Sequence, residues 1–282
     1  MKLAVNFSDA LLSLLEREPE LPVDYIKFPT IPFPGCWEQF ERGKNFRKIL
    51  PHLSQPGVIA LAHPEPGQRF DAGTVLKVLE RTKPPYLSTH LETRVEFFPE
   101  FQAHQHQSDP LLVKTVKAHL LKAIEEVKTA IPVPLVLENF PFYRWWKHYR
   151  LGSESWFIRE ICEAGDCGFL LDIAHARCSA WNMECKVNDY LNELPLVRTR
   201  EIHLAGVQLR EEGLRDAHTA LGEEDYTLFE SVLDRTDPEI VSIEYGGLPD
   251  RIMNLRAEYE PISRNDPEEL REMIKRVVEI CR

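Results

Sequence analysis

The chain has 282 residues, of which 43% are hydrophobic and 28% are charged, an ordinary composition for a soluble globular protein with a sizeable core. Its formal net charge of −11 argues weakly against a nucleic-acid partner, because binding to phosphates depends on lysine and arginine. Bound metal cations would offset much of this charge, so the charge alone does not exclude nucleic acid.

The sequence contains no sign of export or of a membrane span. The first residues, MKLAVNFSDALLSLLERE, are interrupted by Asn6, Ser8 and Asp9, which is wrong for the apolar core of a signal peptide. No apolar run approaches the length of a membrane-spanning helix. The six cysteines form no CxxC pair, and a chain of this length needs no disulfide framework. We therefore expect a cytoplasmic protein with reduced thiols and no contact with a membrane.

Short, almost continuously apolar runs alternate with helical patterns from one end of the chain to the other. Such runs are typical of parallel strands that are buried on both faces. The eight predicted strands are Leu3–Phe7, Val23–Phe28, Gly57–Ala62, Tyr86–Thr89, Leu135–Glu138, Gly168–Asp172, Glu201–Ala205 and Ile240–Glu244.

The segments between these strands carry helix-start signals. Ser8-Asp9, Asp109-Pro110, Ser153 and Asp266-Pro267 are each placed to cap a helix. Eight strands with eight crossovers predict an α/β protein, a (β/α)8 barrel that forms one domain over residues 1–282. The main rival is an open doubly wound sheet, which would require a glycine-rich first turn. The first turn here reads NFSDA.

Two insertions interrupt the regular alternation, Glu92–Ser108 after the fourth strand and Asn139–Gly152 after the fifth. Loops of this length within a compact domain are usually functional or disordered, and their aromatic content argues against disorder. We expect both to lie over the barrel mouth. The motif RWWKHYR in the second insertion could stack on nucleobases, bind a peptide carboxylate or simply pack on the rim. Lys27, within the second strand, could contact an anionic substrate or extend to a helix interface.

Histidine, aspartate and glutamate recur at or just after the ends of the apolar runs. Because the carboxyl ends of barrel strands meet at one mouth, these side chains should converge there, and they are the types that bind zinc, iron and manganese. Nine such groups exceed the needs of a single ion, so we expect two or three. The candidate ligands are His63, His90, Glu138, Asp172, His175, His203, Asp216, His218 and Glu244.

Each of these residues also has a simpler interpretation. A histidine that ends one strand, such as His63, is more often a hydrogen-bonded core or surface group than a ligand. The pair Asp216-x-His218 could be a turn aspartate beside an unrelated surface histidine. The repetition at six strand ends favours the metal site.

The order of these residues resembles the trinuclear site of the endonuclease IV branch of the xylose isomerase-like barrels, including Asn139 after Glu138 and the segment LDIAHA. The wider sequence is more similar to the multinuclear non-haem iron-dependent oxidative enzymes, the methanobactin-synthase-like family. This likeness covers roughly Val58 to Gly247 and rests on YLSTHLE, LVLENFPFY, CGFLLDIAHARCSAWN, DYLNELPL, EIHLAG, GLRDAHT and IEYGG.

The chain departs from that family at two places. The family commonly reads Asp-x-Asn-Asn after the sixth strand, where this chain has Asp172-Ile173-Ala174-His175. Its glycine-rich stretch after the histidine of the third strand is here HPEPGQRF. These departures leave the substrate open.

The resemblance implies an oxidoreductase that uses two or three iron ions and dioxygen to modify a peptide or small molecule, with zinc or manganese as alternative metals. It leaves room for a second protein that presents the peptide. Glu138, Asp172 and His218 would carry the catalysis, with Glu138 bridging two ions. The expected groups around it are Asp172, His203 and Glu244 on one ion, His63 and His90 on a second, and His175, Asp216 and His218 on a third.

Three other functions fit parts of the same pattern. A zinc-loaded cluster could hydrolyse a phosphodiester, as endonuclease IV-like enzymes do, although this chain lacks obvious basic loops to bind DNA. A sugar isomerase or epimerase would leave several ligands unexplained. A catalytically inactive binding protein would not need an intact set of ligands.

Overall fold

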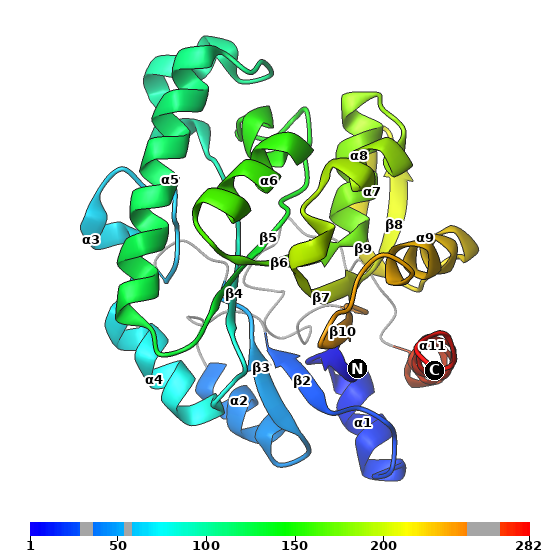
Figure 1. Cartoon of the computed structure of the whole chain (residues 1–282). Coiled ribbons are helices and arrows are strands. Elements are labelled where there is room, and N and C mark those ends of the chain that lie inside the picture. Colours follow the sequence, from blue (N-terminus) through cyan, green and yellow to red (C-terminus); the bar gives the residue numbers. More distant parts are fainter. Residues whose placement is uncertain (29–35, 54–57, 247–265) are drawn as a thin grey trace.

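The structure is a computed structural model that describes residues 1–28, 36–53, 58–246 and 266–282. Its centre is a sheet of eight parallel strands arranged as a barrel (Figure 1). The order around the sheet is β3-β2-β1-β10-β7-β6-β5-β4. A parallel bridge between His52 and Ser88, with Leu53 N donating to Ser88 O over 3.1 Å, joins the two edge strands. The strands therefore form a nearly closed (β/α)8 barrel, as predicted.

The barrel strands are short, and each is followed by at least one helix or turn. Their bounds are β1 (Lys2–Asn6), β2 (Tyr25–Phe28), β3 (Lys48–Pro51), β4 (Leu87–His90), β5 (Leu135–Glu138), β6 (Gly168–Asp172), β7 (Thr199–Leu204) and β10 (Ile240–Ile243). The helices are α1 (Asp9–Arg17), α2 (Cys36–Lys44), α3 (Pro66–Arg69), α4 (Ala72–Thr82), α5 (Pro110–Ala130), α6 (Ser155–Ala164), α7 (Ile173–Met183), α8 (Val187–Glu193), α9 (Glu223–Leu233) and α11 (Pro267–Ile280).

Three of the four predicted helix caps are present. Ser8 Oγ accepts a hydrogen bond from Leu11 N, and the carboxylates of Asp109 and Asp266 accept from the first turns of α5 and α11. The prediction for Ser153 was wrong. Ser153 lies in a 3₁₀ turn, and α6 begins two residues later without a side-chain cap.

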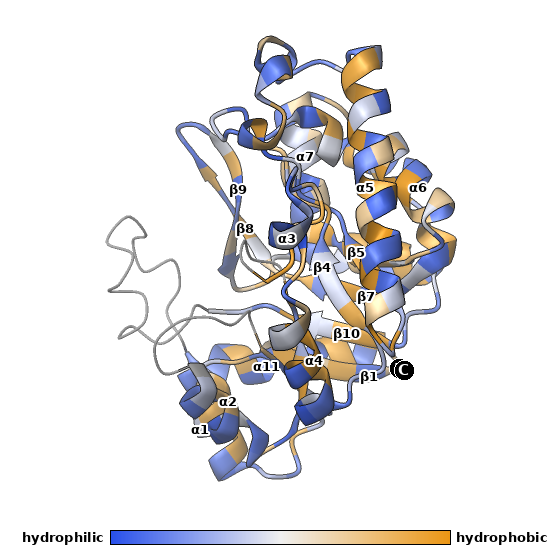
Figure 2. Ribbon diagram, turned by 90° about the vertical axis from the view of Figure 1, so that its left-hand side faces the viewer, coloured by the Kyte–Doolittle hydropathy of each residue, from blue (hydrophilic) through white to orange (hydrophobic). Residues whose placement is uncertain are grey.

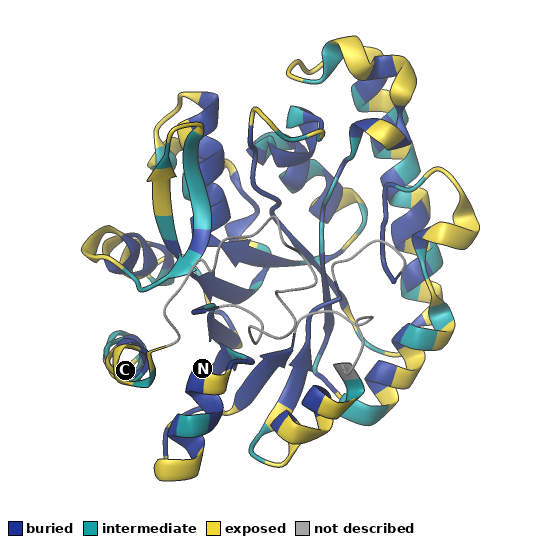
Figure 3. Cartoon of the chain, turned by 180° about the vertical axis from the view of Figure 1, so that it is seen from behind, coloured by how far each residue is buried: buried dark blue, intermediate teal, exposed yellow. Residues whose placement is uncertain are grey.

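The core has two layers. The larger one lies between the barrel strands and the surrounding helices, whose outer faces are exposed (Figure 3). In Figure 2 the barrel strands are mostly hydrophobic, while α5 alternates between hydrophobic and hydrophilic faces. The smaller layer fills one end of the barrel interior and consists of Ala4, Tyr25, Leu50, Tyr86, Val136, Leu170 and Ile240.

The predicted third strand, Gly57–Ala62, was wrong. Gly57 lies outside the described residues, and residues 58–62 form a loop. Within it Ile59 bridges antiparallel to Phe70, and Asp71 N donates to Val58 O. The apolar side chains of this loop pack into the outer core, so their burial does not require a place in the barrel. The barrel position belongs to the short run Lys48–Pro51.

The two predicted insertions join into one structure, which we call the lid: residues 92–108 and 139–152. Arg94 and His148 form an antiparallel bridge, which Tyr149 N extends by donating to Thr93 O over 2.8 Å. Gln105 Nε2 reinforces it with a hydrogen bond to Trp146 O at 2.6 Å. Contact between the two insertions was not predicted from the sequence.

Two further strands, β8 (Gly206–Arg210) and β9 (Gly213–Thr219), form an antiparallel hairpin that follows β7 and stands apart from the barrel sheet (Figures 1 and 2). The hairpin packs on α7, where Asn182 Nδ2 donates to Leu214 O over 3.2 Å. Among the helices that the structure describes, none is long and apolar enough to cross a membrane.

Candidate metal centre

The positions of the acidic and histidine residues follow from the alternation of side chains along each strand. Residues two apart in a strand face the same side of the sheet. Val136 and Leu170 face the barrel interior, so Glu138 and Asp172, two residues later, also face it. Leu50 on β3 directs His52 inward in the same way. The apolar layer at one end of the barrel is thus followed by a polar layer at the mouth.

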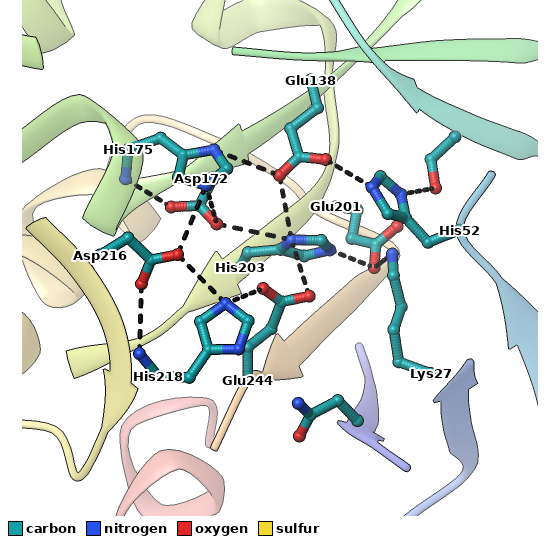
Figure 4. Close-up of polar contacts among 12 residues, drawn as sticks. Lys27, His52, Glu138, Asp172, His175, Glu201, His203, Asp216, His218 and Glu244 are labelled. Atoms are coloured by element: carbon teal, nitrogen blue, oxygen red, sulfur yellow. Dashed lines mark hydrogen bonds and ion pairs between the residues drawn. The ribbon is translucent and has the colours of Figure 1, made fainter. Parts of the chain in front are cut away.

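The first group of ligand atoms surrounds one oxygen of Glu138 (Figure 4). Glu138 Oε2 lies 3.1 Å from His52 Nε2, a contact that Figure 4 shows. It also lies 3.3 Å from His90 Nε2, and these two nitrogens are 3.4 Å apart. His52 Nδ1 lies 2.9 Å from Ser88 Oγ, which leaves Nε2 directed at Glu138. These three residues form one possible ion site.

The second group surrounds the other oxygen of Glu138. Glu138 Oε1 lies 3.3 Å from His203 Nδ1 and 3.5 Å from His175 Nδ1. His203 Nδ1 is also 3.6 Å from Asp172 Oδ2 and 3.3 Å from Glu244 Oε1. His203 lies near the centre of the cluster in Figure 4, with these carboxylates around it.

The third group involves the β8–β9 hairpin. Asp216 Oδ2 lies 3.1 Å from His218 Nε2 and 3.6 Å from His175 Nε2. His218 Nε2 is in turn 3.4 Å from Glu244 Oε2. The hairpin therefore carries two side chains to the barrel mouth, as the spacing Asp216-x-His218 predicted.

Among the residues that the structure describes, three buried atoms of this cluster have no hydrogen-bond partner: Glu138 Oε2, Asp172 Oδ2 and His203 Nδ1. A buried polar atom without a partner costs about 1–3 kcal/mol, so native proteins rarely leave one unexplained. Each atom belongs to a group of three potential ligands that lie within 4.8 Å of one another. The nitrogen and carboxylate donors suit zinc, iron or manganese. The residues therefore fit bound metal ions.

The electrostatics of the cluster follow from burial and from its carboxylates. Burial lowers the pKa of His52 to about 4, despite the nearby Glu138 carboxylate. For His175, burial would lower the pKa, but the Asp172, Asp216 and Glu138 carboxylates outweigh it and raise the pKa to about 10. His218 behaves similarly, with its pKa raised to about 10 by Asp216 and Glu244 against the effect of burial. Protonated His175 and His218 thus balance the negative charge of the carboxylates, a role that bound metal cations would otherwise have.

Asn139 and Asp172 orient the ligand atoms around β5 and β6. The Asn139 side chain donates to Asp172 O over 2.9 Å and accepts from Asp172 N over 2.8 Å. Asp172 caps α7, because its Oδ1 accepts from His175 N over 2.6 Å. The cap occupies one carboxylate oxygen of Asp172 and leaves Oδ2 for an ion.

His218 has a left-handed backbone conformation, with φ of 48°. Such a conformation costs on the order of 1–3 kcal/mol for a residue other than glycine and is concentrated at functional sites. Beside it, Asp216 N donates to Tyr143 Oη over 3.0 Å, which ties the hairpin to the lid. The hairpin is therefore held in place where it delivers its two side chains.

The structure brings eight of the nine predicted ligands together and leaves out His63. The ring of His63 packs against Phe97 at 4.8 Å between centroids and lines a separate cavity of about 530 Å³. His52 occupies the position beside His90 and Glu138 that the sequence analysis had assigned to His63. The sequence analysis missed His52 because it assigned the third strand to the wrong run. The signal was present, because Leu50 and His52 share one face of KILPH.

The structure also bears on two other ambiguous sequence features. Lys27 is only 1% exposed and pairs with Glu201 inside the barrel, so it reaches neither solvent nor a helix interface. In RWWKHYR, Arg144 pairs with Glu184 at 2.8 Å, while the Trp146 and Tyr143 rings pack together. Trp146 thus packs on the residue that precedes the motif, while the Trp145 ring is exposed, and the other two interpretations of the motif stay predictions.

The comparison with known protein families decides among the resemblances. The family described as RiPP precursor modification enzyme MbnB/TglH/ChrH matches residues 53–265. The chain belongs to this family. RiPPs are ribosomally made peptides that are modified after synthesis, and the family's description refers to the enzymes that modify their precursors. The matched range contains all of the clustered residues except His52, which directly precedes it.

Among curated proteins, the chain is similar to several UPF0276 proteins. It is 31% identical to one from Rhizobium meliloti over 198 residues, which cover 65% of this chain and 61% of that protein. It is 33% identical to one from Paraburkholderia phytofirmans over 138 residues, 47% of this chain and 45% of that protein. A relative from Acaryochloris marina is 29% identical over 182 residues, 62% of this chain and 63% of the relative. The chain thus spans between 45% and 63% of these relatives.

Among solved structures, the chain resembles an AP endonuclease of family 2 from Brucella melitensis. The TM-score is 0.55 at 13% identity, and the match covers 92% of this chain and 99% of the other. At this identity the likeness concerns the fold alone. It agrees with the (β/α)8 barrel expected from the sequence.

Proposed function

We propose that this chain is a cytoplasmic metal-dependent oxidoreductase that holds two or three iron ions at the barrel mouth. In this proposal it uses dioxygen to oxidise a residue of a ribosomally made peptide. Membership of a peptide-modifying family supports the substrate class, and the buried cluster of imidazoles and carboxylates supports the metal site. A second protein that presents the peptide is part of the proposal.

The observation that carries the proposal is the position of Glu138 between two sets of ligand atoms. Its side chain is 1% exposed, with Oε2 facing His52 and His90 and Oε1 facing Nδ1 of His203. His175 Nδ1, 3.5 Å from Oε1, is hydrogen-bonded to Asn139 O at 2.8 Å. A single ion would need only one such set. A carboxylate with both oxygens directed at separate nitrogen groups is suited to bridge two ions (Figure 4).

Iron with nitrogen and carboxylate ligands and open coordination positions reacts with dioxygen, and this is the oxidising chemistry that the bound ions would supply. The residues that hold the ions differ in their access to solvent. The side chains of Glu138, Asp172 and His203 are at most 1% exposed, whereas those of His90 and His218 are 21% and 36% exposed. The peptide would therefore approach from the side of His90 and His218. Glu138, Asp172 and His218 are the proposed catalytic residues.

The lid supplies an apolar wall beside the proposed approach. The Phe140 ring lies 5.1 Å from that of His90 and 5.9 Å from that of Trp146. The His148 ring lies 5.1 Å from that of Phe140, and its Nε2 is 2.7 Å from Glu92 Oε1. Such a wall can position a side chain of the peptide and keep water away from a reactive site.

The proposal can be tested with the enzyme purified and loaded with iron under anaerobic conditions. The substrate is a precursor peptide encoded beside its gene, assayed with and without proteins encoded by the neighbouring genes. We expect oxygen uptake together with a change in peptide mass, inhibition by zinc because zinc has no redox chemistry, and loss of both signals in His218→Ala. His63→Ala, outside the cluster, is the matched control.

The opposite outcome would identify a different enzyme. Oxygen-independent cleavage of an abasic duplex by the zinc-loaded protein, lost in His218→Ala, would replace oxidation with phosphodiester hydrolysis. Interconversion of a sugar by the metal-loaded protein, without oxygen, would indicate an isomerase.

A further inference from the structure

Beneath the metal cluster, the barrel interior contains a buried acid that does not face the ions. Glu201 is two residues before His203 on β7, so both side chains point inward. Glu201 is 0% exposed, and its Oε1 lies 2.6 Å from Lys27 Nζ and 3.0 Å from His203 Nε2. Its Oε2 accepts a hydrogen bond from Tyr86 Oη over 3.1 Å. Figure 4 shows Glu201 between Lys27 and His203.

The two ring nitrogens of His203 therefore have different surroundings. Nε2 contacts Glu201, while Nδ1 faces oxygens of Glu138, Asp172 and Glu244 at 3.3, 3.6 and 3.3 Å. Nδ1 is buried and makes no hydrogen bond with the described part of the chain. Lys27 Nζ and Tyr86 Oη both donate to Glu201, so its carboxylate acts as an acceptor and selects the form of His203 that carries its proton on Nε2. The lone pair of neutral His203 is then on Nδ1, among the carboxylates.

We propose that Glu201 is a positioning residue that makes His203 bind metal through Nδ1, and that Lys27 holds the Glu201 carboxylate directed away from the ion. This inference rests on the metal site of the proposed function, but it does not depend on iron or on oxygen chemistry. A partner that fixes the second nitrogen of a ligating histidine typically changes metal affinity about 10- to 100-fold.

The role of Lys27 follows from the geometry around Glu201. If the Glu201 carboxylate could rotate, it could bind an ion itself and compete with the proposed ligands above it. Lys27 Nζ and Tyr86 Oη hold one oxygen each, and both contacts are inside the barrel. Burying a charged pair is expensive in desolvation, and an apolar pair of similar volume would often be as stable. A contribution to stability therefore does not explain why Lys27 and Glu201 form a buried ion pair, whereas the orientation of His203 does.

The direct test is nitrogen NMR of the zinc-loaded wild-type protein with isotope-labelled histidine, because zinc is diamagnetic. The His203 signal is assigned by its loss in His203→Asn. We expect the metal-bound shift at Nδ1 and a proton on Nε2. A proton on Nδ1, or zinc bound through Nε2, would overturn the inference and leave the metal centre itself intact. A wild-type protein that binds no zinc would remove both this inference and the proposed function.

Variants provide a second test with its own control. Lys27→Met/Glu201→Leu removes the ion pair without leaving one buried charge unpaired. We expect its zinc affinity to fall about 10- to 100-fold, with the fixed proton on Nε2 lost. Lys27→Met/Glu201→Gln keeps a neutral acceptor for Nε2–H and should recover part of the affinity. Arg17→Met/Glu268→Gln removes an exposed ion pair instead of the buried one and should retain wild-type binding. Unchanged affinity and an unchanged Nδ1 signal in the leucine variant would contradict the proposal.

Discussion

The two halves of the barrel mouth contribute very differently to the cluster. The half from β4 through β7 to β10, with the β8–β9 hairpin, contributes eight of the clustered residues: His90, Glu138, Asp172, His175, His203, Asp216, His218 and Glu244. Within the described residues, the half made of β1, β2 and β3 contributes His52 and, beneath the cluster, Lys27. The family match begins at residue 53. The part of the barrel inside the family match thus carries eight of the clustered residues, and the other part completes the barrel and adds His52.

The largest expected effect comes from Glu138, the residue that connects the two halves. Glu138→Ala should release more than one ion per chain and abolish turnover, because both carboxylate oxygens are lost. Elemental analysis after anaerobic loading measures this. The control Glu239→Ala, which removes a surface partner of Arg200, should keep the full metal content. Loss of a single ion in Glu138→Ala would mean that Glu138 does not bridge.

A comparison of two histidines tests the one ligand from the β1–β3 half. His52→Ala should lower the metal content by one ion, because His52 Nε2 lies 3.1 Å from Glu138 Oε2. His63→Ala should leave it unchanged, because that ring packs against Phe97 in a separate cavity. The same elemental analysis reads both variants. Loss of one ion in His63→Ala and none in His52→Ala would show that His63, in the loop after β3, is the ligand and His52 is not.

Metal removal should destabilise the protein. Metal bound only to the native state at a thousandfold excess over Kd adds about 4 kcal/mol of stability. For a chain of this size, chelation should lower the melting temperature by roughly 8 °C. Differential scanning calorimetry of loaded and chelated protein is the measurement. An unchanged transition in a preparation shown to be free of metal would contradict it.

Metal binding should depend on pH through the β6–β9 side of the cluster. The pKa of His175 and that of His218 rise from 6.5 to about 10 in the metal-free protein, against the effect of burial, because of the facing carboxylates. Both imidazoles therefore carry protons at neutral pH, and an ion must displace them. Apparent affinity should rise with pH up to about 10, with protons released on binding. Calorimetry in buffers of different ionisation enthalpy measures the release, and none at neutral pH would count against this arrangement.

The smallest expected effect concerns the lid. Gln105→Ala removes the 2.6 Å hydrogen bond from Nε2 to Trp146 O between the two insertions, at about 1 kcal/mol of stability. Turnover should fall while metal content stays the same, because the ligands lie on other segments. Paired assays of metal and of turnover separate the two effects. A parallel loss of metal would show that the lid supports the cluster directly.

Most of the barrel could be predicted from sequence because buried parallel strands carry a strong local signal. The run LVLE and the run GFLLD were assigned with the bounds that the structure has. The third strand could not be assigned in this way, because the loop beyond it is more apolar than KILP and is also buried. Apolar content reports burial, and it does not distinguish a strand inside the barrel from a loop packed on its outside.

The site was predictable to the extent that its residues end strands. Glu138 and Asp172 were found for that reason, whereas His52 was missed together with its strand. Glu201 gave no signal, because an acid two residues before a ligand looks like any strand residue until Lys27 is seen to pair with it across the barrel. That contact joins residues 174 positions apart, and only the closed barrel brings them together.

The central claim is that Glu138 lies between two metal ions at one barrel mouth. Anomalous diffraction from crystals of the metal-loaded wild-type protein, recorded at the absorption edge of the bound metal, tests it most directly. The account predicts a peak on each side of the Glu138 carboxylate, one beside His52 and His90 and the other beside His203. A single peak on one side, or none in protein shown to be loaded, would contradict it.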